Sequence, residues 1–296
     1  MLARPQFLAR GFIIAALCSA LALLGGCSAL RIAYAQAPDL AYWWLDGYVD
    51  FNDAQTPKVR EALAEWFAWH RRTQLPDYAN QLARAQAELA ADTTAARACE
   101  WQGELLKRAH TAWERAAPAA ADLVLTVTPQ QIQHVARRYA KSNAEFRDDY
   151  LQPNAARRAE VTLKRTVDRA ETLYGRLTEA QRTRIAEGLQ RSPFDPEVWF
   201  SEREQRQQAI LAMLRRVNAD GTSIDEALAA VRTQVEQIER SPREAYRRYT
   251  DRLNEFNCAF AANLHNSTSA AQRRTAAQKL AGWEGDLRAL VVYAPR

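Results

Sequence analysis

The chain has 296 residues, of which 48% are hydrophobic and 25% charged, with a formal net charge of +5. The first 26 residues carry two arginines and no acid, so the remainder carries +3 (5 minus 2), too balanced a charge for nucleic-acid binding. Glycine is scarce, while Ala, Arg, Gln, Glu and Leu, all good helix formers, dominate. The composition therefore predicts an almost wholly helical protein, long enough to bury a substantial core.

The N-terminal segment is built like an export signal. Arg4 and Arg10 make its first ten residues basic, residues 11–24 are apolar, and small residues follow. The apolar run is too short to be read as a membrane-spanning helix. We therefore expect residues 1–26 to be a signal peptide.

The four residues that close this segment, Leu24-Gly25-Gly26-Cys27, resemble the lipobox of bacterial lipoproteins. The resemblance implies cleavage before Cys27 and a diacylglycerol on its thiol. Ser28 follows instead of Asp, which by analogy favours the outer membrane. We expect a lipidated N-terminus and tether at 27–37, then a helical domain over 38–296 that faces the periplasm. The alternative is an ordinary signal peptide, cleaved or uncleaved, with a chance cysteine.

Cysteine usage is consistent with that compartment. Once Cys18 leaves with the signal and Cys27 is acylated, only Cys99 and Cys258 remain. An oxidising periplasm allows such a pair to form a disulfide. The alternative is two unpaired buried thiols.

Helical patterns then follow one another along the chain. An aromatic-rich segment covers 41–51, and Asn52 or Asp53 is placed to cap a helix over the following residues. The apolar positions of that helix step by three and four, so they form one stripe, and they are Val59, Leu63, Trp66 and His70. Because proline disrupts helices, we expect Pro76 to interrupt the pattern and Pro118 to end the next stretch.

The second half of the chain is divided by helix-start signals. Capping boxes begin at Thr128, Thr178, Ser223 and Ser241, and a last helix begins near Ser269. A turn-rich break covers 192–196, followed by Trp199 and Phe200. The stripes are typical of packed antiparallel helices. We expect one all-α domain, a multi-helix antiparallel bundle of about nine helices.

One five-residue element recurs at four helix starts, 51–55, 127–131, 177–181 and 268–272. Leu177-Thr178-Glu179-Ala180-Gln181 matches the LTxxQ motif and so resembles Spy/CpxP-type periplasmic chaperones, which bind unfolded clients. The mechanics of the element are those of a capping box, in which Thr caps a backbone amide and Gln reaches back.

A wider resemblance covers nearly the whole chain. The signal and lipobox, YWWLDGYVDFNDAQ at 42–55, WHRRTQLPDYA at 69–79 and the tail at 272–290 resemble an uncharacterised family of all-helical bacterial lipoproteins, a domain of unknown function. The resemblance implies location and fold class and supplies no activity.

The sequence contains no spacing pattern that is typical of a catalytic site. The four histidines form no metal-ligand pair, and we find no phosphate loop or nucleophile elbow. Asp46, Asp50 and Asp53 fall near one helical face, where they are better explained as a solvated face or helix end than as a cation site. We therefore predict no catalytic residues, no metal and no cofactor.

The strongest candidate for binding is an aromatic and basic block. Trp and Arg anchor interfaces more often than other residues, so an exposed groove here would bind a peptide or lipid. The alternative is core packing of Trp66 and His70, because amphipathic stripes usually face the core. Trp43 and Trp44 are also suited to a membrane interface. The members of the block are Trp43, Trp44, Trp66, Trp69, His70, Arg71 and Arg72.

Three functional hypotheses follow. The first is an outer-membrane lipoprotein whose periplasmic domain binds a protein, as an envelope adaptor or chaperone-like factor. The second is an enzyme or small-ligand carrier with a pocket near His70. The third is a passive structural lipoprotein of the envelope. All three have the membrane as a partner through the lipid anchor.

Overall fold

The computed structural model describes residues 29–152, 154–218 and 221–292. These residues form eleven α-helices and no strand, so the all-α prediction is confirmed, with eleven helices in place of about nine. The expected signal peptide and Cys27 lie outside the described residues. In chain order the helices are α2 (Ala29–Ala35), α3 (Ala37–Val49), α4 (Gln55–Glu88), α5 (Ala95–Val124), α6 (Pro129–Tyr150), α7 (Ala155–Tyr174), α8 (Glu179–Arg191), α9 (Pro196–Val217), α10 (Ile224–Glu239), α11 (Glu244–Asn266) and α12 (Ala270–Val292).

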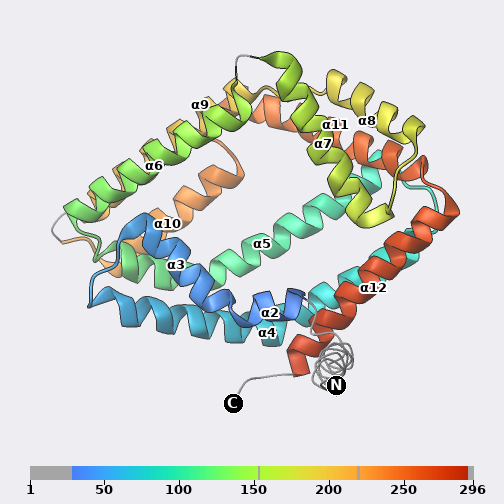
Figure 1. The fold of residues 1–296 in the computed structure, drawn as a ribbon. Coiled ribbons are helices and arrows are strands. Elements are labelled where there is room, and N and C mark those ends of the chain that lie inside the picture. Colours follow the sequence, from blue (N-terminus) through green and yellow to red (C-terminus); the bar gives the residue numbers. More distant parts are fainter. Residues whose placement is uncertain (1–28, 153, 219–220, 293–296) are drawn as a thin grey trace, which may run out of the picture.

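The helices are arranged around a four-sided frame (Figure 1). Helix α4 forms one long side and packs along α12, which closes the right side. Helices α6 and α9 form the upper left side, while α7, α8 and α11 form the upper right. Helix α5 crosses the frame and contacts α10 and α11, and α2 and α3 lie along α4. No described helix is both long and apolar enough to cross a bilayer.

Two buried clusters form the core, one at each end of the frame. The first joins α5, α6, α9 and α10 through residues that include Ala121, Ile132, Leu214 and Val231. The second joins α7, α8 and α12 around Ile185 and Ala276, both fully buried. Ile132, Leu214 and Val231 lie on amphipathic helices, which present their apolar sides to the core.

Two of the expected helix boundaries are wrong. Helix α4 continues through Pro76 and α5 continues through Pro118. A proline inside a helix costs about 3 kcal/mol because it removes a hydrogen bond and crowds the preceding turn. Leu75 and Ala79 are almost completely buried on either side of Pro76, and Ala117 and Ala121 flank Pro118 in the same way. We attribute the continuity to this packing, which offsets the local cost.

The structure also differs from two other expectations, which concern the start of α11 and the expected tether. Helix α11 begins at Glu244 with Arg243 as its N-cap, so the capping box expected from Ser241 is wrong. Ser241 is buried, and its hydroxyl oxygen accepts the Arg243 amide instead, which delays the helix start. Residues 29–35, within the segment expected to be a tether, form helix α2, whose Arg31 pairs with Asp286 of α12 at 2.8 Å.

The capping boxes predicted at Thr128, Thr178 and Ser223 are confirmed. Each of these hydroxyls accepts the backbone amide three residues on, and the residue there returns a side-chain oxygen to the cap amide. Ser269 and Gln272 form the same reciprocal pair at the start of α12. Asn52 and Gln55 also form a reciprocal pair ahead of α4. The Asn52 side chain accepts from Gln55 N at 3.0 Å, and the Gln55 side chain accepts from Asn52 N.

The first corner of the frame is the contact between two of these elements, 52–55 and 128–131. Gln131 Nε2 donates to Gln55 Oε1 at 2.6 Å, and Gln55 Nε2 approaches Gln131 Oε1 at 3.3 Å. Each amide nitrogen also donates to a carbonyl ahead of the other element, to Asp50 O and Thr126 O respectively. The starts of α4 and α6 are thereby joined, and the two helices diverge from this point (Figure 1).

The second corner repeats this arrangement with 178–181 and 269–272. Gln181 and Gln272 exchange two hydrogen bonds of 2.9 Å. Their amide nitrogens donate further to Ser267 O and Arg176 O, the same relative positions as in the first corner. Helices α8 and α12 start here, at the opposite end of the frame (Figure 1).

The predicted disulfide is present in this structure. Cys99 of α5 and Cys258 of α11 are bonded, with a Cα–Cα distance of 5.3 Å and a sequence separation of 159 residues. Closing so long a loop restricts the unfolded chain, and bonds of this kind contribute about 2–5 kcal/mol to stability. The bond links α5, which crosses the frame, to its upper right side.

From the paired glutamines at the two corners we predict that glutamate cannot replace glutamine there without loss of stability. A glutamine accepts from its own cap amide and donates to its partner, whereas a carboxylate only accepts. We expect Gln131→Glu and Gln181→Glu each to lower the free energy of unfolding by about 1–3 kcal/mol, measured by urea denaturation, because buried acceptors lose their donor. The matched control is Glu226→Gln, at the capping box of α10, where the Glu226 side chain bonds back to Ser223 and we expect little change. Equal effects at all three positions would contradict this role of the pairs.

Candidate binding surfaces

The structure divides the aromatic and basic block into separate parts. Trp66 and His70 are half-buried on α4, with their rings 4.7 Å apart and nearly parallel. The Tyr34 hydroxyl of α2 shares a 2.8 Å hydrogen bond with His70 Nδ1, and Trp66 Nε1 donates to Ala112 O of α5 at 2.9 Å. Burial lowers the pKa of His70, which favours the neutral ring. This part of the block packs α2, α4 and α5 together.

The remaining α4 members of the block surround that packed cluster. Trp69 is half-buried, with its ring centre 6.0 Å from that of Trp66. The Arg71 guanidinium carbon lies 5.4 Å from the Tyr34 ring centre, and Arg72 is exposed. Arg72 is thus exposed at the edge of the cluster, while Trp69, like Trp66 and His70, is half-buried.

Trp43 and Trp44 lie on a different helix, α3, and are among its most exposed side chains. They are 61% and 64% exposed, and the ring of Trp44 lies 5.0 Å from that of Tyr48. Because α3 and α4 are separate helices, closeness in sequence does not place these two indoles in the cluster around His70.

The acids between 46 and 53 are at the end of α3. Asp46 Oδ1 accepts the Phe51 amide at 2.9 Å, and Asp50 is the C-cap, with a left-handed φ of 61°. Their interpretation as a helix end is therefore confirmed. Within the described residues, no group of three or more His, Cys, Asp or Glu side chains is placed to hold a metal ion.

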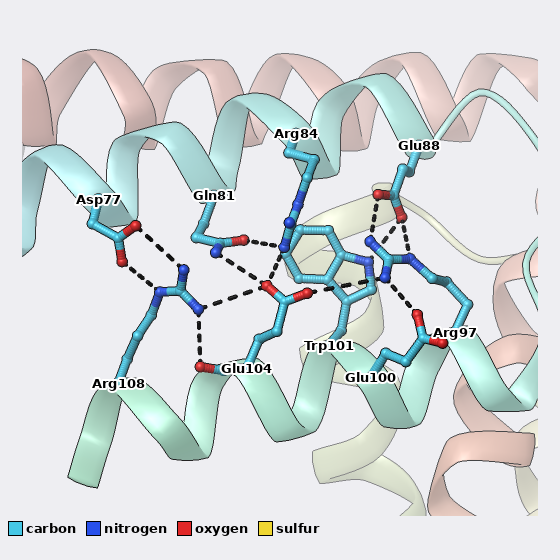
Figure 2. Close-up of polar contacts among 9 residues, drawn as sticks. All are labelled: Asp77, Gln81, Arg84, Glu88, Arg97, Glu100, Trp101, Glu104 and Arg108. Carbon is cyan, nitrogen blue, oxygen red and sulfur yellow. Dashed lines mark hydrogen bonds and ion pairs between the residues drawn. The ribbon is translucent and has the colours of Figure 1, made fainter. Parts of the chain in front are cut away.

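A cluster of charged and polar side chains lies between α4 and α5 (Figure 2). Glu88 accepts two hydrogen bonds from Arg97, at 2.7 and 2.9 Å, and a third from Trp101 Nε1 at 2.9 Å. Arg84 and Arg97 lie over the Trp101 ring, with their guanidinium carbons 4.4 and 5.1 Å from its centre. Glu104 accepts from Arg84 and Gln81, and Arg108 bridges Glu104 and Asp77.

In this cluster every charged group that Figure 2 draws has an opposite partner. Hydrogen bonds from Arg97 lower the pKa of Glu88 to about 2. Partial desolvation opposes this shift, and the hydrogen bond from Trp101 adds to it. Hydrogen bonding to Arg84 likewise lowers the pKa of Glu104. Carboxylates held ionised by fixed arginines are poor proton carriers near neutral pH. The cluster therefore holds α4 against α5.

An open groove lies between the N-terminal halves of α9 and α11. Its volume is about 710 Å³, and its floor includes Tyr246 and Tyr249, whose ring centres are 5.6 Å apart. Val198 of α9, 38% exposed, lines it together with Ala245 of α11. Its other lining residues are Pro193, Asp195, Glu197, Ser201, Glu202, Gln205, Arg243 and Arg252.

Side chains join the two walls of this groove. Glu202 of α9, only 3% exposed, accepts from Arg243 Nε at 2.7 Å and from Arg206 Nε at 2.9 Å. Burial opposes ionisation of Glu202, but the Arg243 and Ser241 hydrogen bonds and both arginine charges outweigh it and lower its pKa. The Tyr249 hydroxyl oxygen accepts the Asp195 amide at 3.0 Å. The groove is thus preformed.

Sequence reasoning did not find this groove. The signals it did find were the break at 192–196 and Trp199 with Phe200, and both belong to the start of α9. Phe200 is buried, and Phe146 stacks on it and on Trp199, at 5.4 and 4.8 Å. The groove needs α11, which starts 48 residues after the start of α9 (244 minus 196), so no local pattern connects its walls.

The comparisons with known proteins give a family match and supply no activity. The chain matches the profile of a family described as a family of unknown function (DUF6279) over residues 47–247. Because this match covers more than half of the chain, the chain belongs to that family. No curated protein and no solved structure matches it. The matched residues include the groove wall on α9 and the start of α11.

The Glu88 contacts predict a pH-dependent contribution to stability. The pKa of Glu88 is lowered from 4.5 to about 2, so its stabilisation is full above 4.5 and is lost as the pH falls through about 2. We expect Glu88→Gln to lower the free energy of unfolding at neutral pH by about 1 kcal/mol or less, since the pair is partly exposed. Urea unfolding across this range should show the difference from wild type vanish at low pH. Glu100→Gln, which removes a 61% exposed partner of the same arginine, is the control with the smaller effect.

Proposed function

We propose that this member of the DUF6279 family is an outer-membrane lipoprotein that is anchored through Cys27 and whose helical frame binds a protein in the periplasm. The basic, apolar and small-residue order of residues 1–27 supports the anchor. The Cys99–Cys258 disulfide suits an oxidising compartment.

The groove between α9 and α11 carries the binding part of the proposal. Tyrosine and arginine are enriched in interface anchors, and this groove combines a tyrosine floor with an exposed apolar wall. Arg252 and Glu197 place both signs of charge along it. An open groove with an apolar floor and mixed charges suits an amphipathic segment of a protein better than a small, highly charged substrate.

The ionisable groups of the groove favour binding over catalysis. Glu202 is held by Arg243 and Arg206, so its carboxylate is occupied by ion pairs. Asp195 caps α9 by accepting the amides of Glu197 and Val198. A general base needs to reach the proton that it removes, and these two carboxylates are already engaged.

The anchor is tested by removing its thiol. We expect the wild-type chain to float with membranes in a density gradient and to carry lipid on Cys27 by mass spectrometry. Cys27→Ser should leave the protein in the soluble fraction or as an unprocessed precursor, because no diacylglycerol can be attached. Cys18→Ser, within the expected signal, is the matched control and should float normally. Flotation of the Cys27→Ser chain to the wild-type extent would contradict the anchor.

Partner binding is tested by photo-crosslinking in living cells. A photoreactive residue at Val198 should give one or a few dominant protein adducts, identified by mass spectrometry. Ala245→Trp fills the groove from an exposed position and should reduce those adducts at least tenfold. Ala261→Trp, also exposed and on α11, should not. Both variants should keep the wild-type unfolding midpoint.

A second crosslinking position separates the two candidate surfaces. Adducts from Trp69 but not from Val198 would transfer binding to the edge of the cluster around His70 and contradict the groove. A broad distribution of unfolded envelope proteins at Val198 would indicate chaperone-like binding, and a single adduct would indicate an adaptor. No protein adduct at either position would count against protein binding.

A further inference from the structure

Helix α3 has apolar side chains on two opposite sides. Tyr42 is buried, and Val49 packs against the core cluster of α5, α6, α9 and α10. On the other side Leu40, Trp43 and Trp44 are 51%, 61% and 64% exposed. A helix that is apolar all round is normally covered all round. Among the described residues, the second side of α3 lies mostly uncovered.

Helix α2 continues this exposed side. Only Gln36 separates α2 from α3, and its backbone is helical, with φ −91° and ψ −3°. Gln36 N donates to Ile32 O at 3.2 Å, and Leu40 N donates to Gln36 O at 3.0 Å. Helical spacing of eight and three residues then places Ile32, Leu40 and Trp43 toward one side. Ile32 is 57% exposed, and we refer to Ile32, Leu40, Trp43 and Trp44 as the α2–α3 strip.

The charged groups beside the strip are paired. Asp39 pairs with Arg60 at 2.8 Å, and Arg31 pairs with Asp286 at 2.8 Å. Moving a paired charge toward a less polar medium costs less than moving an isolated one. The flanks of the strip are therefore compatible with an interfacial environment.

The position of the strip along the chain indicates what covers it. Ile32 follows Cys27 by five residues in the sequence and Trp44 follows it by 17, and the helical path from Ile32 to Trp44 is about 18 Å at 1.5 Å per residue. Residues 11–24, which precede Cys27, are the most apolar run of the chain. The exposed apolar side chains are thus concentrated in the described segment that lies nearest to the expected lipid.

We propose that the α2–α3 strip lies on the membrane surface, with Trp43 and Trp44 at the level of the lipid headgroups. Indoles favour that interface, and an apolar helix side beside them lies in its plane. The inference rests on the proposed anchor at Cys27. A lipid alone fixes one point of the chain, whereas the strip adds a line of contact and so orients the frame. Helices α9 and α11, whose residues line the groove, lie on the opposite side of the frame from α2 (Figure 1).

The test uses the full chain as cells process it, reconstituted in vesicles of phosphatidylethanolamine and phosphatidylglycerol that contain brominated phosphatidylcholine. Bromine quenches indoles that it contacts. Trp43 and Trp44 are two of eight tryptophans, so we expect roughly a quarter of the emission to be quenched. Trp43→Phe with Trp44→Phe should abolish that fraction. Trp199→Phe, on α9, is the matched control and should retain it.

The outcomes separate the strip from the anchor and from the groove. A chain that floats with the vesicles but shows no quenched fraction overturns the strip and leaves the anchor in place. The same quenched fraction in the double variant also overturns it. A chain that does not associate with vesicles overturns both the strip and the anchor. Protein adducts at a photoreactive residue placed at Trp43, together with no quenched fraction, would make the strip a protein surface, whatever Val198 captures.

Discussion

Two pairs of glutamine side chains hold the opposite corners of this frame. In each pair the two amides bond to each other, and each also bonds to its own cap and to a carbonyl beside the partner's cap. Gln55, Gln131 and Gln181 are almost fully buried, so every amide group needs a partner. Only a side chain with both a donor and an acceptor meets this demand, which explains glutamine at all four positions.

The corners determine where the long helices begin and in which directions they leave. From the first corner α4 and α6 diverge, and from the second α8 and α12 diverge, so the helices surround a frame (Figure 1). A core cluster lies beside each corner, and the disulfide ties α5 to α11 between them. The ion pairs of Figure 2 hold α4 to α5 near the hairpin that joins them. Together these contacts give a scaffold on which separate surfaces are presented in fixed directions.

The aromatic block shows how far sequence reasoning reaches at a site. Trp66 and His70 lie on a helical stripe, and the structure packs both of them, as the stripe predicts. The same reasoning grouped Trp43 and Trp44 with them because they are near in sequence, yet they are exposed on α3. Periodicity states which side of one helix is apolar. It does not state which sides of different helices join, and the groove between α9 and α11 was missed for the same reason.

The sequence by itself determined the helical class, most helix starts, three of the four predicted capping boxes and the cysteine pair, because these depend on residues close in the chain or on simple counting. It did not determine that α4 and α5 continue through Pro76 and Pro118, since that depends on packing by neighbouring helices. Nor did it show that the repeated capping elements bond in pairs, 76 and 91 residues apart. Those contacts were decided by tertiary structure, because a buried amide is satisfied by whichever distant group the fold brings to it.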